Sequence, residues 1–565
     1  MLGLAGVLVV GLLALAWCGW TAYRVHSDLN EARDQALILE AALARGDVDG
    51  ARLANASFKE ATEAAAGRTD GPVWGGFGGL PVFGDDAKGL ATVTDVLSDI
   101  AESGIPPVLD SAAGLNAGSY APTDHQFPLD RIAALRAPVT ESSAVFADAA
   151  DRLDRIDAGG FVSPLREDLD RLRDEVRIAA ATLDTAQRAS ELMPGLLGGE
   201  GPRDYLLVFQ TNAELRATGG LPGVMSLIHA ENGRVDITRQ ASAGAMGELD
   251  KPVLPLTAEE LQLYGPQLGT YFLDSNFTPD LPRAAELWRA RWRLETGTDI
   301  DGVFVVDPVA VSYLLGTAGV MQVEGRALTE QTIVTEVEHL AYLRYADQVS
   351  QDGFFNAVAD AAFDVFANGG GDPVDLVTGL IRGVGEHRIL MHAFAPDEQA
   401  LIAGTTIAAE LDEAPTDTPE VGVYLNDGTG AKMSFFLDHE VQVTSASCQN
   451  GRQTLMGQLR VTSDTPPNVA GLPQTVVGFE DGFGDSVEPG DQLLVADLHA
   501  PVGGTIREIA FDGEPLPDPA VDHYRGREVV SLGLPLDPGQ TRVVTWTMVT
   551  GPDQTAPAEI SVTPG

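Results

Sequence analysis

The pattern of apolar and polar positions changes three times along the chain and divides it into four segments. The first is an uncharged run over residues 2–22, LGLAGVLVVGLLALAWCGWTA. About 20 apolar residues in a helix match the hydrocarbon thickness of a bilayer, and no later run is as long. A cleaved signal peptide would need a basic start and small residues at its cleavage site. We therefore predict an uncleaved transmembrane anchor over residues 1–25.

Helical spacing dominates the second segment, residues 26–198. Apolar residues recur at intervals of three and four, as on one face of a helix, at Leu29, Ala32, Ala36, Leu39 and Leu43 and again at Leu165, Leu169, Leu172, Val176, Ala179 and Leu183. Ser163-Pro164 opens the second helix, and Pro194-Gly195 is expected to close it. The Gly-rich stretch 74–84 lacks the Lys-Ser/Thr of a phosphate-binding loop, which favours a turn. The segment predicts an antiparallel bundle that acts as a spacer.

Strands and helices alternate in the third segment, residues 199–411. The continuous apolar run 204–209 is typical of a strand buried on both faces, and Asn232-Gly233 between two apolar runs predicts a hairpin. A helix fits 281–296, and the run GVFVVD at 302–307 fits another strand. Alternating strands and helices indicate a layered α/β domain.

Helical periodicity stops in the fourth segment, residues 412–565. The Pro/Asp-rich stretch 412–420 reads as a linker. Seven short alternating or apolar runs follow, punctuated by Gly, Pro, Asp and Asn, at 433–437, 440–446, 452–462, 492–499, 505–511, 528–533 and 541–549. Short strands without helices predict a β-sandwich of immunoglobulin-like architecture.

Charge and cysteine content narrow the functional classes. The net charge of −46 excludes nucleic acid as a partner, because its phosphates need a basic surface. Cys18 and Cys448 are the only cysteines, so no disulfide framework is available and Cys448 is expected to be a small buried hydrophobe. Together with the anchor, an acidic soluble remainder predicts a single-pass cell-membrane protein whose large domain is extracytoplasmic.

Three ordered motifs between residues 200 and 400 carry a family resemblance. They are RDYLLVFQTNAELRATGGLPG at 203–223, YFLDSNFTPDLPRAAELW at 271–288 and TGTDIDGVFVVDPVAVSYLLGTAG at 296–319. The chain resembles the domain-of-unknown-function 4012 family of membrane-anchored envelope proteins, common in actinobacteria. The resemblance implies a cell-envelope role.

The same region is similar, more distantly, to the LytR–CpsA–Psr phosphotransferases, which move lipid-pyrophosphate-linked glycopolymers with the help of arginines and Mg²⁺. Glu214 and Arg216 stand near that family's Asp-x-Arg, and Arg239 near its second arginine. Other positions depart from the pattern: Leu221-Pro222 replaces an Arg-Ser-Asp trio, and Asp352–Ala361 holds no arginine. Bidentate arginines are what fix pyrophosphate, so these losses put transfer in doubt.

The candidate site residues follow from the residue patterns and from the resemblance to the phosphotransferases. The ligand-binding set is Arg216, Arg239, Glu214 and Asn276, and Asp274 is the candidate ligand of a metal ion. The alternative for Arg216 is an ion pair with Glu214 or Asp274 that holds the loop. The alternative for Asp274 and Asn276 is turn chemistry and capping before the helix at 281–296.

Two functions remain open at this point. The first is a non-enzymatic envelope protein, without a cofactor, that binds a polyprenyl glycolipid or cell-wall glycan and contacts an envelope partner. The second is a divergent Mg²⁺-dependent glycopolymer phosphotransferase acting on polyprenyl-pyrophosphate-linked glycans. No serine nucleophile elbow or Walker loop occurs in the sequence.

Overall fold

The computed structural model describes residues 23–565 except 44, 72–73, 75–83, 113–119, 468, 479–487 and 489. The chain divides into two compact units. The first comprises residues up to Ala121 together with Pro128–Leu196, and the second comprises Pro122–Phe127 together with Leu197–Gly565. The Gly-rich stretch 74–84 lies almost wholly outside the described residues.

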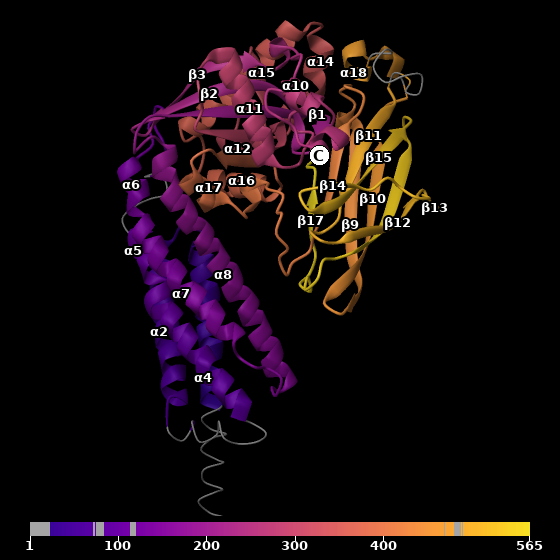
Figure 1. The fold of residues 1–565 in the computed structure, drawn as a ribbon. Helices are drawn as coiled ribbons and strands as arrows, with labels where there is room; N and C mark the ends of the chain where they lie inside the picture. The colour runs from indigo at the N-terminus through magenta and orange to yellow at the C-terminus, as the bar shows by residue number, and fades with distance from the viewer. Residues whose placement is uncertain are drawn as a thin grey trace, which may run out of the picture. The chain divides into compact units, whose positions relative to one another are not determined.

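The first unit is a bundle of helices (Figure 1). Residues 23–43 are helical, and the further helices are α2 (Val48–Thr69), α4 (Gly84–Asp99), a π-helical turn (Ile100–Gly104), α5 (Pro106–Ala112), α6 (Leu129–Ala134), α7 (Arg136–Asp154) and α8 (Ser163–Leu196). Their shared core includes Phe58, Ile100, Leu153 and Leu169. The expected end of the last helix at Pro194-Gly195 is one to two residues too early. Pro194 lacks the N–H for one backbone hydrogen bond, and the helix continues for only two residues beyond it.

The predicted fold class and localisation need a correction. Among the described residues, no helix is both long and apolar enough to cross a membrane. The helices of the first unit are amphipathic and carry charges on their outer faces, as α8 does with Asp168, Arg171 and Asp174. The predicted anchor at residues 2–22 lies outside the described residues. The prediction of a single-pass membrane protein with an N-terminal transmembrane helix is therefore not supported.

A five-stranded sheet organises the first part of the second unit. Its strand order is β3 (Arg234–Ser242), β2 (Gly219–Glu231), β1 (Arg203–Arg216), β4 (Gly302–Val306) and β7 (Ile389–Ala393). Only β1 and β4 run parallel; the other neighbours are antiparallel. The hairpin at Asn232-Gly233 is confirmed, with φ of +51° and +83°, the conformation that a tight two-residue turn requires.

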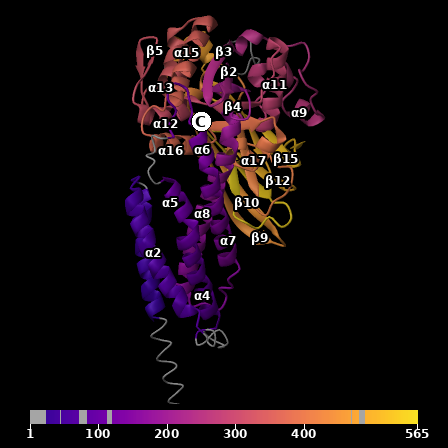
Figure 2. The same cartoon turned by 90° about the vertical axis from the view of Figure 1, so that its left-hand side faces the viewer.

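Helices cover both faces of this sheet. On one face, α11 (Leu281–Thr296) packs Trp288 and Trp292 against Leu206 and Val208 of β1. On the other face, Phe209 packs with residues of α12 (Pro308–Ala318) and α15 (Gln348–Ala367). Figure 2 shows α11 and α12 on opposite sides of β4. The smaller elements are α9 (Ala258–Leu263), α10 (Gln267–Thr270), β5 (Met321–Val323), β6 (Arg326–Leu328), α13 (Ile333–Thr335), a π-helical turn (Glu336–Leu340), α14 (Ala341–Arg344), α16 (Pro373–Gly385) and α17 (Pro396–Ile402).

The second part is a sandwich of two five-stranded sheets (Figure 1). One sheet has the order β13 (Glu514–Pro515), β12 (Thr505–Phe511), β16 (Thr541–Val549), β10 (Arg452–Ser463) and β9 (Leu437–Gln449); the other has β14 (Asp522–Tyr524), β15 (Arg527–Leu536), β11 (Gln492–His499), β8 (Glu420–Asp427) and β17 (Glu559–Val562). Leu425, Leu459, Leu498 and Trp546 contribute to the core between them.

Two local predictions in this sandwich are wrong. The expected strand at 433–437 is mostly a 3-10 turn, Ser434–Phe436. Its two phenylalanines pack into the core of the first part of the second unit, the α/β part, and not between the sandwich sheets. Cys448 is an exposed thiol and not a buried one, since the last residues of β9 extend past the sandwich core.

Candidate functional site

Arg216, the first predicted ligand contact, is buried at the end of β1 and makes four hydrogen bonds to other groups of the chain. Its Nη2 donates to Glu214 Oε1 at 2.7 Å and to Asp274 Oδ1 at 3.0 Å. Its Nη1 and Nε donate to the carbonyl oxygens of Leu215 and Leu273 at 3.0 and 3.3 Å. The guanidinium also lies 4.7 Å above the ring of Phe277. This geometry matches the alternative in which Arg216 holds the loop.

Glu214 connects the two parts of the second unit. Its carboxylate accepts from Arg216 and from Lys432, which follows β8 in the sandwich. Burial alone would favour the neutral acid, but the charges of Lys432 and Arg216 outweigh it and lower the pKa of Glu214 to about 2. Burial raises the pKa of Asp274, and the positive charge of Arg216 opposes this shift. The cluster is thus a compensated set of buried charges.

The other predicted residues are separated or structural. Asn276 is fully buried and donates to Thr218 Oγ1 at 2.8 Å and to Gly220 O at 2.9 Å, so it fixes the turn between β1 and β2. Arg239 is exposed on β3 opposite Leu227, whereas Arg216 lies opposite Gly219. Eight residues along β2 correspond to roughly 25 Å. The structure brings Glu214, Arg216 and Asp274 together but leaves Arg239 apart.

The metal site predicted at Asp274 lacks a set of ligands in the described residues. Within the described residues, no group of three or more His, Cys, Asp or Glu side chains is placed to hold a metal ion. The carboxylate of Asp274 instead accepts from the guanidinium of Arg216.

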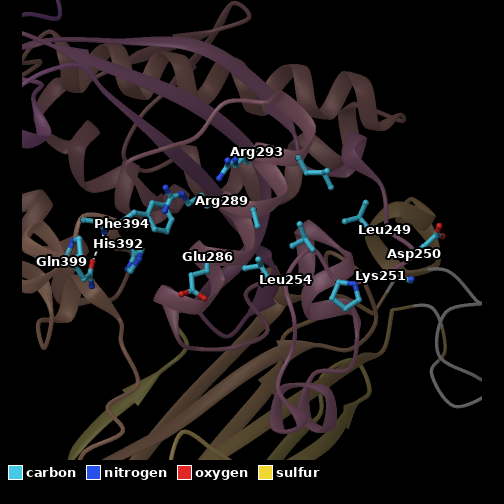
Figure 3. A pocket seen from close by; sticks show the side chains of 16 residues that line it. Leu249, Asp250, Lys251, Leu254, Glu286, Arg289, Arg293, His392, Phe394 and Gln399 are labelled. Carbon is cyan, nitrogen blue, oxygen red and sulfur yellow. Dashed lines mark hydrogen bonds between the residues drawn. The ribbon is translucent and has the colours of Figure 1, made fainter.

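An open groove of about 1350 Å³ lies elsewhere on the α/β part, along the outer side of α11 (Figure 3). Its base is a stripe of α11 that recurs every three to four residues: Glu286, Arg289, Ala290, Arg293 and Leu294. The opposite stripe of the same helix holds the fully buried Trp288 and Trp292. Helical periodicity therefore fixes which side chains face the groove once the tryptophans are buried.

Two further segments form the walls of the groove. Residues 249–254 bound one side, with Lys251 exposed and Val253 and Leu254 half-buried. The segment from the end of β7 into α17 bounds the other side, with His392, Phe394 and Gln399. Figure 3 shows Phe394, His392 and Gln399 together on one side of Glu286, and Leu249, Asp250 and Lys251 on the other.

Arg289 and Arg293 differ in how tightly the chain holds them. Arg289 makes two hydrogen bonds to Asp299, at 2.6 and 2.9 Å, and its guanidinium lies 4.2 Å above the ring of Phe394. Arg293 is 70% exposed and approaches Asp299 only to 3.9 Å. Arg289 is therefore a fixed part of the groove base, while Arg293 keeps donors for a ligand.

His392 adds a buried polar group to the groove lining. It is 9% exposed, and its Nδ1 has no hydrogen-bond partner. Burial lowers the pKa of His392, while the carboxylates of Glu410 and Glu286 oppose that shift. The neutral ring can donate to or accept from a ligand hydroxyl. The side-chain amide oxygen of Gln399, Oε1, accepts a hydrogen bond from Ala393 N at 2.9 Å, and this bond holds the wall in place.

Sequence reasoning missed this groove. The motif YFLDSNFTPDLPRAAELW and the helix 281–296 were recognised, but the outward stripe of α11 reads as an ordinary solvated face. One feature of the sequence could have indicated the groove: Leu294, an apolar residue between Arg293 and Glu295 on the outward face of α11, which the structure leaves exposed. Residues 249–254 and 392–399 are separated by 138 positions, from 254 to 392, and only the fold brings them to the same helix.

The comparisons with known proteins bear on the α/β part. No curated protein and no solved structure matches the chain. The more distant similarity to LytR–CpsA–Psr phosphotransferases therefore stays a hypothesis. Residues 200–342, which span β1 to α14, match the family described as "Protein of unknown function (DUF4012)", and this match confirms the predicted DUF4012 resemblance over that range.

Proposed function

We propose that this protein is a non-enzymatic binding protein for a cell-envelope glycan, or for the sugar part of a glycolipid, and that the ligand lies in the α11 groove. The observation that carries the proposal is the make-up of that groove. Exposed or half-buried apolar side chains alternate there with donors (Arg293 and Lys251), an acceptor (Glu286) and a ring that can do both (His392). Sugars present the same alternation, with C–H faces and hydroxyl groups.

Each part of the groove has a role in this proposal. Val253, Leu254 and Leu294 supply apolar surface for the C–H faces of a pyranose ring. The Glu286 carboxylate accepts from sugar hydroxyls, and His392 donates to them or accepts from them. Arg293 and Lys251 donate to hydroxyl or anionic substituents. The distant resemblance to enzymes that handle glycopolymers is a second support for glycan as the ligand class.

The state of Arg216 argues for binding over transfer. Phosphoryl-transfer enzymes stabilise the transferring group with cationic donors or Mg²⁺, and the LytR–CpsA–Psr enzymes use arginines that face the pyrophosphate. Arg216 directs its donors to Glu214, Asp274 and two carbonyl oxygens. Arg239 lies on β3, opposite a β2 residue that is eight positions from the partner of Arg216. We therefore expect the purified protein to show no Mg²⁺-dependent hydrolysis of polyprenyl pyrophosphates.

Arg293→Ala is expected to weaken glycan binding by about tenfold, because a charge-assisted hydrogen bond contributes on the order of 1.5–3 kcal/mol. Isothermal titration of soluble cell-wall oligosaccharides into the full chain measures this effect. Arg171→Ala on α8 is the matched control, since Arg171 is similarly exposed (59%) and does not line the groove. Equal affinities for both variants and the unmodified chain would refute the groove as the site.

A further inference from the structure

Residues Pro122–Phe127 form a strap on the edge of the five-stranded sheet, beside β3. The chain leaves the first unit at Ala121, adds this strap to the second unit and re-enters the first unit at Pro128. Gln126 forms an antiparallel bridge with Arg234, the first residue of β3. The strap thus covers part of an edge strand that no other described strand pairs with on this side.

The strap turns sharply at Asp124 and His125. Their φ angles are +51° and +64°, the conformation of a tight two-residue turn, which aspartate and histidine accept more readily than most residues. Thr123 and Gln126 exchange main-chain hydrogen bonds of 3.1 and 3.0 Å across the turn. The imidazole of His125 lies between β3 and α15, and its ring meets that of Phe363 edge-on at 5.7 Å.

Two carboxylates from different elements approach this imidazole. Its Nδ1 is 2.9 Å from Asp236 Oδ1 on β3, and its Nε2 is 3.2 Å from Asp364 Oδ1 on α15. A neutral imidazole carries one N–H and one lone pair, whereas ionised carboxylates only accept. One of the two contacts is therefore repulsive when the ring is neutral. Both contacts are attractive when the ring is protonated.

Further charged groups surround the pair of carboxylates, on the strap, on the neighbouring strands and on the helix: Asp124, Asp204, His229, Arg234 and Asp360. The Arg234 guanidinium pairs with Asp236 at 2.7 Å. His229 lies opposite Asp236 on β2 and is paired with Asp204 at 2.8 Å. Carboxylates outnumber the one guanidinium in this set, so a positive charge on the imidazole of the strap is stabilised.

We propose that the strap is a pH-dependent clasp, tightened when His125 is protonated and pairs with Asp236 and Asp364 together, and loosened when the ring is neutral. Histidine exchanges its proton between about pH 5 and pH 8, a range in which most carboxyl groups stay ionised. The two ion pairs tie the strap to β3 and α15 at once. Without them, main-chain bonds hold it, such as those from Phe127 N to Gly233 O at 2.8 Å and from Val235 N to the strap at 3.0 Å.

Hydrogen–deuterium exchange of the full chain measures how often the strap opens, once the rates are corrected for the pH dependence of the chemical step. A partly exposed ion pair changes an equilibrium by roughly 1.4- to 5-fold, so the opening constant of the strap amides should be about fivefold larger at pH 8 than at pH 5.5. His125→Gln, which is neutral at every pH, should open at pH 5.5 as readily as at pH 8. His523→Gln, on the exposed face of β14, is the matched control and should keep the ratio of the unmodified chain. His229 is present in every chain, so its own titration cancels.

Asp364→Asn separates the clasp from a purely structural role of His125. The asparagine leaves Asp236 as the one carboxylate beside the ring, and its amide can donate to the neutral imidazole. The strap should then stay closed at pH 8, and the ratio of opening constants should fall to about twofold or less. An unmodified chain whose strap opens equally at both pH values would overturn the proposal. A His125→Gln or Asp364→Asn chain that keeps the full ratio would overturn it as well.

Discussion

Replacing Arg216 with alanine should destabilise the protein by about 3–5 kcal/mol, the usual cost of removing one partner from a buried charge pair. The variant leaves the Asp274 carboxylate buried without its cation, and Glu214 keeps only Lys432. It also frees the carbonyl oxygens of Leu215 and Leu273. Lys432 belongs to the sandwich and Glu214 to β1. The loss of stability should therefore come mainly from weaker packing between the two parts of the second unit.

Urea unfolding of the full chain measures this loss as a lower midpoint. Arg239→Ala is the control, because Arg239 is exposed on β3 and an exposed substitution of this kind should stay within about 0.5 kcal/mol. The same samples decide between the two roles that the sequence left open for Arg216. Normal stability combined with a selective loss of polyprenyl pyrophosphate binding would favour the ligand role and contradict the structural one.

Replacing Glu338 with glutamine should stabilise the protein at pH 8 by up to about 4 kcal/mol and have little effect below pH 5. Burial and the nearby carboxylate of Asp307 raise the pKa of Glu338 from 4.5 to about 8, although Asn212 N–H and Arg388 oppose the shift. The folded chain therefore keeps a proton that the unfolded chain releases above pH 4.5. The contribution of Glu338 to stability is complete below pH 4.5 and is lost as the pH rises through 8.

Glutamine suits this position because it is neutral at every pH and its Oε1 can still accept from Asn212 N–H. Thermal unfolding at pH 5, 6, 7 and 8 should show a difference between variant and unmodified chain that widens with pH. Burial also raises the pKa of Asp497, to about 7, but Asp497 is present in both proteins and cancels in the difference. Glu330→Gln, at an exposed site, serves as control; a pH-independent difference for Glu338→Gln would contradict the assignment.

The sequence predicted secondary structure correctly where the residues of one segment are enough to determine it. The helix at 281–296 forms with the expected bounds because its apolar face, its proline at the start and Gly297 at the end agree. The hairpin at Asn232-Gly233 forms because few other residues accept positive φ. The match of residues 200–342 to DUF4012 likewise follows from contiguous motifs.

Errors arose where contacts between distant segments override the local pattern. The largely apolar run 433–437 reads as a strand, but Ser434–Phe436 form a turn that packs into a core made by other elements. β8 begins at Glu420, at the end of a stretch that reads as a linker, because β11 and β17 supply its ladder partners. No periodicity in a single segment can report a partner 70 or 140 residues away.

The sequence by itself determined the charge of the surface, the order of helical and strand-rich segments, and the α/β family resemblance, since all three follow from composition and neighbouring residues. Only the tertiary structure decided the candidate site. It paired Arg216 with Glu214 and Asp274, placed Arg239 apart from them on β3, and joined α11 to residues 249–254 and 392–399. A side chain's availability depends on what surrounds it in space, and burial and ion pairing are properties of the fold.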